Sequence, residues 1–279
     1  MIDVIKIGGN ENVGMSNILD DVAELVGQGR RVVVVHGASH RIARLGERLG
    51  RPPRYFISPS GLRSRYTDRD TLDVLLMAFS AVNKEIVAHL RRKSIRAVGL
   101  SGMDGGLVSG VRKQALRASQ HGRVSIIRDD YSARIAAVDP ALVNCLVGNG
   151  FVPVISPPAF DATEGPVNVD ADRLAASIAA ALLPSRLFLL TDVPGLLRDR
   201  ADPSSLVRQV TAADIEDALQ LAEGRMKLKV LAAHEAARRG VAPVVIADSR
   251  RPRPVLSAIA APGTVFSGSA DAEAPHAAL

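Results

Sequence analysis

Short apolar runs alternate with amphipathic segments along most of this sequence, and this alternation limits the folds that the chain can adopt. Runs with the length of buried strands lie at 2–7, 31–35, 152–155, 186–191 and 242–246. Between them apolar residues recur at helical spacing, as at Leu174, Ile178 and Leu182. Strands that alternate with helices form a largely parallel sheet. The sequence therefore predicts the α/β class, with helices covering both faces of that sheet.

The other segments divide into helices and stretches broken by proline and glycine. Ser16 is expected to cap a helix that reaches Gly29. Further helices are predicted from the loop after His36 to Gly50 and at 68–92, 141–148, 170–183, 212–223 and 226–239. Prolines and a glycine make 52–67 irregular, and glycines between 95 and 138 predict antiparallel hairpins. The end, 268–279, is predicted to be a disordered tail.

The charge of the chain favours anionic partners. Its 35 Lys and Arg against 29 Asp and Glu give a net charge of +6. Aromatic residues make up only 3% of the chain and Trp is absent, so few side chains could stack on nucleic acid bases. No nucleic acid partner is therefore expected. An anionic substrate or an acidic protein accounts for the charge, and solubility alone is the alternative explanation.

The apolar runs and the cysteine content indicate a cytoplasmic protein. No apolar run reaches the roughly 20 residues that a membrane helix needs, so no membrane association is expected. The chain enters its first strand without a basic and apolar leader. Cys145 is the one cysteine, which excludes an internal disulfide and a multi-cysteine metal site. A reducing, cytoplasmic compartment fits these features.

Two loops that follow strands are candidates for an anion site. Lys6 ends the first apolar run, and Gly8 and Gly9 follow it. A lysine in a buried strand loses hydration unless an anion compensates it, and glycines let backbone N–H groups approach that anion. Gly37 and Ala38 follow the second strand, and loops at the carboxyl ends of neighbouring parallel strands form a cleft. The alternative is an edge-strand lysine before a plain glycine turn.

The second half of the chain contains three further motifs. Asn168 and Asp172 flank the start of a helix, where Asp172 either interacts with the helix dipole or positions lysines that contact phosphate. A later strand ends at Thr191, and Asp192 and a Pro-Gly turn at Gly195 follow it. Lys229 follows a Gly-Arg-Met sequence near a helix N-terminus, where a cation is unfavourable without an anion.

Taken in this order and spacing, these motifs resemble those of the amino acid kinase family, within it the branch that contains N-acetylglutamate kinase. The resemblance covers residues from 1 to about 266. It implies a three-layer αβα sandwich with a mainly parallel central sheet, an acceptor lobe at 1–169 and a nucleotide-binding lobe at 170–267. It also implies a homodimer, ATP with Mg²⁺ as the phosphoryl donor, and a carboxyl group as the acceptor.

The resemblance assigns a role to each motif residue. Lys6 and Lys229 would neutralise the transferring phosphoryl group, and Asp172 would orient both lysines. The acceptor would lie against Gly37, Ala38 and Asn168, although Ala38 stands where the family usually has glycine. The nucleotide site would be lined by Gly8, Gly9, Thr191, Asp192 and Gly195. No direct protein ligand to Mg²⁺ is implied.

The segment 58–68 indicates the acceptor. Its Ser-Arg-Tyr-Thr-Asp run looks like that of kinases acting on an amino-group carrier protein, which makes Arg65 the clamp for the substrate carboxylate. The implied substrate is 2-aminoadipate or glutamate carried on a small acidic protein, in lysine or arginine biosynthesis. A basic rim would attract such a carrier. Candidates for that rim are Arg51, Arg54, Arg63, Arg112 and Lys113.

Two other functions remain open from the sequence. The first is an N-acetyl-L-glutamate 5-kinase that acts on the free small molecule. The second, of another class, is a nucleotide-binding regulator that has kept the fold and lost catalysis. The presence of both Lys6 and Lys229 disfavours the regulator.

Overall fold

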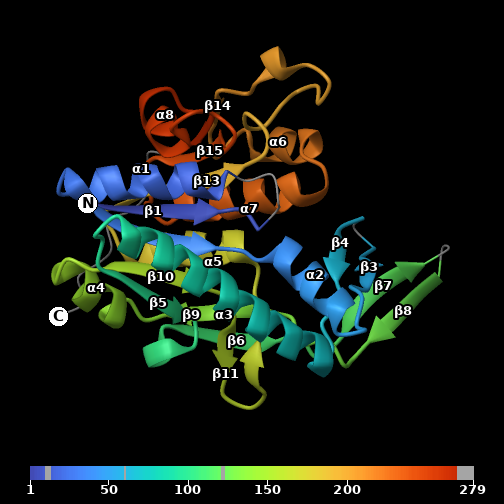
Figure 1. The fold of residues 1–279 in the computed structure, drawn as a ribbon. Coiled ribbons are helices and arrows are strands. Elements are labelled where there is room, and N and C mark those ends of the chain that lie inside the picture. Colours follow the sequence, from blue (N-terminus) through green and yellow to red (C-terminus); the bar gives the residue numbers. More distant parts are fainter. Residues whose placement is uncertain (10–13, 60, 121–122, 269–279) are drawn as a thin grey trace, which may run out of the picture.

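An eight-stranded sheet forms the middle layer of the molecule (Figure 1). The computed structural model describes residues 1–9, 14–59, 61–120 and 123–268; the predicted tail, beyond residue 268, lies outside them. Neighbouring strands of the sheet are parallel except β15 and β16. From edge to edge the strands are β14 (Gln209–Val210), β16 (Thr264–Phe266), β15 (Val244–Asp248), β13 (Ser185–Thr191), β1 (Ile2–Ile7), β2 (Arg31–His36), β10 (Val152–Ser156) and β5 (Ala97–Ser101).

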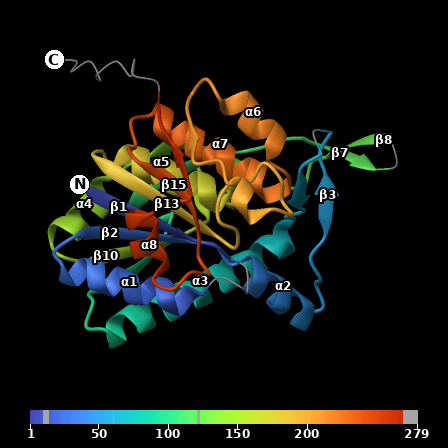
Figure 2. The ribbon, with the colours of Figure 1, turned by 90° about the horizontal axis from the view of Figure 1, so that it is seen from above.

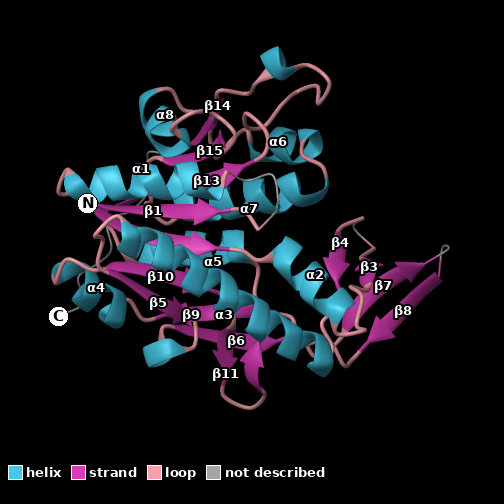
Figure 3. Ribbon diagram, viewed as in Figure 1, coloured by secondary structure: helices cyan, strands magenta, loops and turns pink. Residues whose placement is uncertain are grey.

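Helices cover both faces of this sheet (Figures 1 and 3). One face is covered by α1 (Met15–Gly27), α2 (Ser39–Arg48), α3 (Arg69–Arg92) and α8 (Pro254–Ala260). The other is covered by α4 (Ala141–Gly148), α5 (Ala171–Ala181), α6 (Ile215–Leu221) and α7 (Gly224–Arg238). Side chains alternate between the two cores, so Val4 packs under α5 and α7 whereas Ile5 packs under α1 and α3. The predicted three-layer αβα sandwich is confirmed.

Two four-stranded sheets lie beside the sandwich. The first contains β12 (Gly165–Val167), β11 (Ala159–Asp161), β6 (Val108–Arg112) and β9 (Ala133–Val138). The second contains β4 (Arg63–Arg65), β3 (Tyr55–Ile57), β7 (Leu116–Gln120) and β8 (Arg123–Ile127). This second sheet projects from the body near α2 (Figures 1 and 2), and we call it the projecting sheet. Single 3₁₀ turns lie at η1 (Asp104–Gly106) and η2 (Pro203–Ser205).

Three local predictions are wrong. Gly14, not Ser16, precedes the first turn of α1, and Ser16 lies inside the helix. The stretch 52–67, predicted to be irregular, contains β3 and β4, which pair with each other, and β3 also pairs with β7. β5 does not join an antiparallel hairpin but pairs in parallel with β10 at the edge of the main sheet. Of the described helices, none is long and apolar enough to cross a membrane.

The two halves of the chain build adjoining halves of the main sheet. β1, β2, β10 and β5 come from the first half, and β13, β15, β16 and β14 from the second. They join where residues 2–6 of β1 pair with residues 185–189 of β13. Because these central strands are parallel, their carboxyl ends reach the same edge of the sheet. Loops from both halves therefore meet at that edge.

A buried amide ties α3 to three strands of the first half. Nδ2 of Asn83 lies 2.8 Å from the carbonyl oxygen of Val154, 3.1 Å from that of Leu100 and 3.2 Å from Nε2 of His36. Burial lowers the pKa of His36 to about 4, so the neutral ring accepts from this amide. Gly99 of β5 leaves the space that the amide needs, since a Cβ built there would lie 1.9 Å from Oδ1 of Asn83.

We expect Gly99→Ala to lower the free energy of unfolding by about 1–3 kcal/mol, because it displaces the Asn83 amide from its buried acceptors. The same substitution should cost clearly less in an Asn83→Ala background, which lacks the clashing atom. Urea unfolding of the wild type, both single variants and the double variant measures the coupling. Strictly additive costs would contradict this account of Gly99.

Candidate active site

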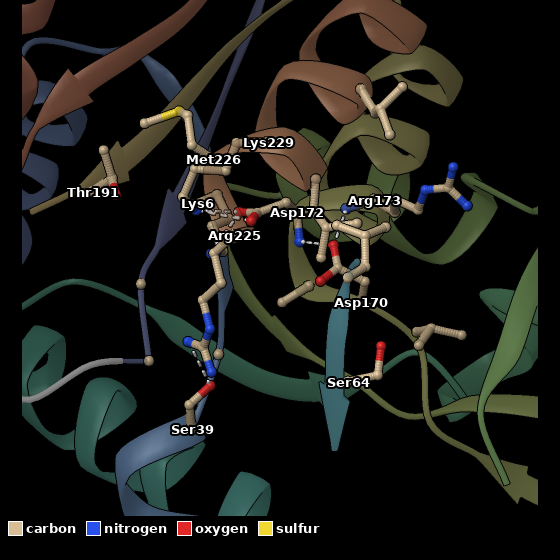
Figure 4. Close-up of a pocket in the computed structure, with 18 of the residues that line it drawn as sticks. Lys6, Ser39, Ser64, Asp170, Asp172, Arg173, Thr191, Arg225, Met226 and Lys229 are labelled. Atoms are coloured by element: carbon tan, nitrogen blue, oxygen red, sulfur yellow. Dashed lines mark hydrogen bonds and ion pairs between the residues drawn. The ribbon is translucent and has the colours of Figure 1, made fainter. Parts of the chain in front are cut away.

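A cavity of about 770 Å³ opens at the edge of the main sheet where β1, β2 and β13 end (Figure 4). The structure brings to its wall all the residues that were predicted to be catalytic, substrate-binding or nucleotide-binding: Lys6, Gly8, Gly9, Gly37, Ala38, Arg65, Asn168, Asp172, Thr191, Asp192, Gly195 and Lys229. Ligands of open α/β sheets bind at the carboxyl ends of the strands. The cavity therefore lies where a ligand is expected to bind in this fold. The role of each residue stays a prediction.

Two lysines from opposite halves of the chain meet one aspartate in this cavity (Figure 4). Nζ of Lys6 lies 2.6 Å from Oδ1 of Asp172, and Nζ of Lys229 donates to Oδ1 at 2.9 Å and to Oδ2 at 2.8 Å. Lys6 is 5%, Asp172 6% and Lys229 7% exposed. Lys6 reaches this position because it shares the face of Val4, which α5 and α7 cover.

The electrostatics of this cluster favour an anionic ligand. Burial lowers the pKa of Lys6 to about 8, although Asp172 opposes the shift, and the charge of Lys229 adds to it. Burial alone would raise the pKa of Asp172, but the attraction of Lys229 and Lys6 outweighs it and holds that pKa well below its usual range. Two cations thus share one carboxylate. An anion in the cavity would balance the remaining positive charge.

The first turn of α5 presents Asp172 to the lysines. Asp170 caps this helix, and its Oδ1 accepts from the backbone N–H groups of Asp172 and Arg173 at 3.0 Å. Asp170 thus satisfies two N–H groups at the start of the helix. The carboxylate of Asp172 points instead toward Lys6 and Lys229 (Figure 4). Asp172 therefore links Lys6 of β1 to Lys229 of α7.

The glycine loop after β1 packs directly on the loop after β2. A Cβ at Gly9 would lie 2.5 Å from the backbone nitrogen of Ser39 and 2.6 Å from that of Ala38, so any side chain would force the loops apart. Ala38 itself has φ −142°, so this position does not need the positive φ that favours glycine. The N-terminus of α2 therefore lies beside the loop that follows Lys6, which suits an anion.

An apolar wall and an anchored loop form the second-half side of the cavity. The wall is made by Leu190, Val193, Leu197, Leu221 and Met226. The loop that carries Gly195 is fixed by Thr264 of β16, whose Oγ1 accepts from the backbone of Leu196 at 2.9 Å and donates to the carbonyl of Val207 at 2.7 Å. This side offers apolar contacts and a fixed backbone, which suit a planar base.

Two guanidinium groups converge at the start of α2 on the first-half side. Nη2 of Arg65 donates to the carbonyl oxygen of Ser39 at 3.3 Å, and Nη1 of Arg225 donates to the Ser39 hydroxyl at 3.4 Å. The backbone of Asn168 is held between Tyr131 and Ala133 by hydrogen bonds of 2.9 and 2.8 Å. A carboxylate in this part of the cavity would find two arginines and an amide nearby.

The cavity is more basic than the sequence motifs indicate. Nine Lys or Arg residues line it against four Asp or Glu. Arg134 and Arg200 are among the nine, and no local sequence signal distinguishes them from solvated surface residues. Arg112, expected on the basic rim, instead turns inward and donates to Glu164 and to the backbone carbonyls of Asp130 and Arg128.

Comparisons with known proteins identify relatives of this chain. The sequence pattern of the amino acid kinase family matches residues 1–248. The chain is 42% identical to the [LysW]-aminoadipate kinase of Deinococcus radiodurans, covering 95% of this chain and 91% of that protein. It is 40% identical to the [LysW]-aminoadipate kinase of Thermus thermophilus, covering 94% and 98%. The structure of smu.665 from Streptococcus mutans shares the fold, with a TM-score of 0.75 at 20% identity over 95% of this chain and 98% of that one. The chain therefore belongs to the amino acid kinase family.

Proposed function

We propose that this protein is an ATP-dependent kinase that phosphorylates the side-chain carboxylate of 2-aminoadipate or glutamate held by its amino group on a small acidic carrier protein. The reaction would serve lysine or arginine biosynthesis. The observation that carries the proposal is the buried cluster of Lys6, Asp172 and Lys229, which suits a transferring phosphoryl group. The relatives named [LysW]-aminoadipate kinase support the carrier-bound substrate.

The proposed reaction needs positioning and charge rather than proton transfer. A carboxylate oxygen of the acceptor attacks the γ-phosphorus of ATP, the bond from that phosphorus to the β–γ bridging oxygen breaks, and ADP leaves. The acceptor is already ionised at neutral pH, so no general base is required. Lys6 and Lys229 would stabilise the charge on the transferring group, with Asp172 holding both ammonium groups in place.

The cavity divides between the two substrates in this proposal. The acceptor would lie in the lobe of residues 1–169, with its carboxylate near Arg65 and its amide end near Asn168, Gly37 and Ala38. The nucleotide would lie in the lobe of 170–267, its base on the apolar wall and its phosphates near Gly8, Gly9, Thr191, Asp192 and Gly195. Mg²⁺ would bind phosphate oxygens, as is usual for nucleotide-bound magnesium. A cytoplasmic homodimer is part of the same proposal.

Replacing either lysine tests the cluster. We expect Lys6→Ala and Lys229→Ala each to lower kcat by about 10²–10³-fold, since each removes one charge that stabilises the transition state. ADP release under saturating substrates measures kcat, and circular dichroism checks that both variants are folded. A rate close to that of the wild type in either variant would remove that lysine from the mechanism.

The pKa of Lys6 predicts how ATP binding depends on pH. Bound phosphate favours the protonated lysine, so affinity for ATP should fall as pH rises through about 8, by at most about tenfold per pH unit. Lys6→Arg should move this decline to higher pH, because a guanidinium group stays charged. Calorimetric titration between pH 7 and 10 reports binding even if the variant is inactive. The same decline in both proteins would assign it to another group.

The acceptor is tested by comparing the candidate substrates one at a time. We expect rapid ADP release with a LysW carrier loaded with 2-aminoadipate or glutamate, and little with free N-acetyl-L-glutamate. Efficient turnover of N-acetyl-L-glutamate alone would favour the 5-kinase instead. Binding of ATP without turnover of any of these acceptors would favour a nucleotide-binding regulator.

A further inference from the structure

Most of the net positive charge of the chain lies in the two connections that build the projecting sheet. The two connections that build it, 49–68 between α2 and α3 and 113–132 between β6 and β9, contain eight Lys or Arg and three Asp or Glu. These 40 residues therefore carry an excess of five positive charges out of the net +6 of the whole chain. The remainder of the protein is close to neutral, so the sheet is where an acidic partner would be attracted.

The three acidic residues of these connections are engaged at the base of the sheet. Asp130 is buried and accepts from the backbone N–H groups of Thr67 and Ser132, both at 2.7 Å. Asp68 caps α3 and pairs with Arg54. Asp129 accepts from the hydroxyl of Tyr66. The carboxylates hold the sheet in place, and positive charge dominates its surface.

The register of the projecting sheet gathers exposed apolar residues on one face. Tyr55 pairs with Arg65 and Ile57 with Arg63 across β3 and β4, and Ile57 pairs with Ser119 of β7. Across β7 and β8, Ser119 pairs with Val124 and Arg117 with Ile126. Residues paired across antiparallel strands lie on the same face. This basic apolar face consists of Tyr55, Ile57, Arg63, Arg65, Arg117, Ser119, Val124 and Ile126.

The apolar residues of this face are accessible to a partner. Val124 is 59%, Ile126 57% and Ile57 49% exposed. Large apolar side chains gathered on one exposed face are a common feature of interaction sites. Arginine beside apolar and aromatic residues is likewise typical of protein interfaces.

The basic apolar face is continuous with the mouth of the cavity. Arg63 and Arg65 line the cavity from β4, the edge strand of the sheet. The guanidinium group of Arg63 also lies 3.8 Å from the ring centre of Tyr55, and Arg65 reaches the start of α2 at Ser39. The face thus leads from the mouth of the cavity out along β7 and β8 (Figures 1 and 2).

We propose that the basic apolar face docks the body of the acidic carrier protein while its substrate-bearing end enters the cavity. This inference rests on the proposed function. The face could bind either a second copy of this chain or the acidic carrier, and charge favours the carrier. A symmetric contact between two copies would bring two positively charged faces together, whereas an acidic carrier neutralises the charge. The apolar residues supply contact area, and the arginines orient the partner.

Substitutions far from the cavity test the docking. Arg117 and Ile126 belong to the face and do not line the cavity. We expect Arg117→Glu and Ile126→Ser each to raise the KM for aminoadipate-loaded LysW carrier from the same organism by about tenfold or more. The value of kcat at saturating carrier and the Kd for ATP should not change. Raising ionic strength should increase the wild-type KM, and less so that of Arg117→Glu.

Matched controls carry the same changes elsewhere on the surface. Arg92→Glu at the end of α3 and Phe160→Ser on β11 alter an exposed charge and an exposed apolar residue away from the face, and both should leave the KM for the carrier within about twofold of the wild-type value. Circular dichroism and thermal melting check that all four variants fold.

The outcomes separate the docking from the function. If the wild type phosphorylates the loaded carrier but neither face variant changes its KM, the docking proposal is wrong and the function stands. If the wild type does not phosphorylate the loaded carrier, the proposed function fails and the docking with it. A change of oligomeric state in the face variants, with KM unchanged, would assign the face to contacts between copies of this chain.

Discussion

The buried contact of Asp172 with Lys6 and Lys229 is the interaction on which the site depends. Three charged side chains with 5–7% exposure meet here, and Asp172 is the carboxylate that both lysines contact, so its loss would leave two buried cations without a compensating charge. Lys6 belongs to the first half of the chain, and Lys229 and Asp172 belong to the second. The parallel pairing of β1 with β13 sets the distance between these halves, so the architecture of the sheet fixes the geometry of the chemistry.

Much of the fold could be predicted because its signals are local. Buried strands such as β1 and β2 are short, mostly apolar runs, and Asp68 is a helix cap within reach of its own helix. The short strands β3 and β4 could not be predicted, since β4 pairs with β3 and β3 pairs with β7, where Ser119 lies about 60 residues beyond its partner Ile57. The same holds for Gly99, whose requirement for glycine comes from Asn83 of another element.

Site residues that directly follow strands could be predicted from the sequence. Those that reach the cavity from other segments could not. The glycine loops and Thr191 lie at strand ends, where the rule for open α/β sheets places ligands. Arg134 and Arg200 line the same cavity from segments that carry no motif. Arg112 was expected on the basic rim, but its side chain bonds to Glu164 and to the carbonyl of Asp130 within the fold. A count of charges along the sequence cannot reveal such contacts.

The attachment of the projecting sheet has a consequence for how such a protein can be altered. Thr67 and Tyr131 lie at the ends of two distant connections, yet the amide of Tyr131 donates to the carbonyl of Thr67 at 2.7 Å, and Asp130 holds the amide of Thr67 beside it. Both connections therefore return to the body at a single joint. Because these returning ends hold each other, a sheet taken from a relative would have to be grafted as both connections together, while the glycine loops and the lysine pair stay untouched.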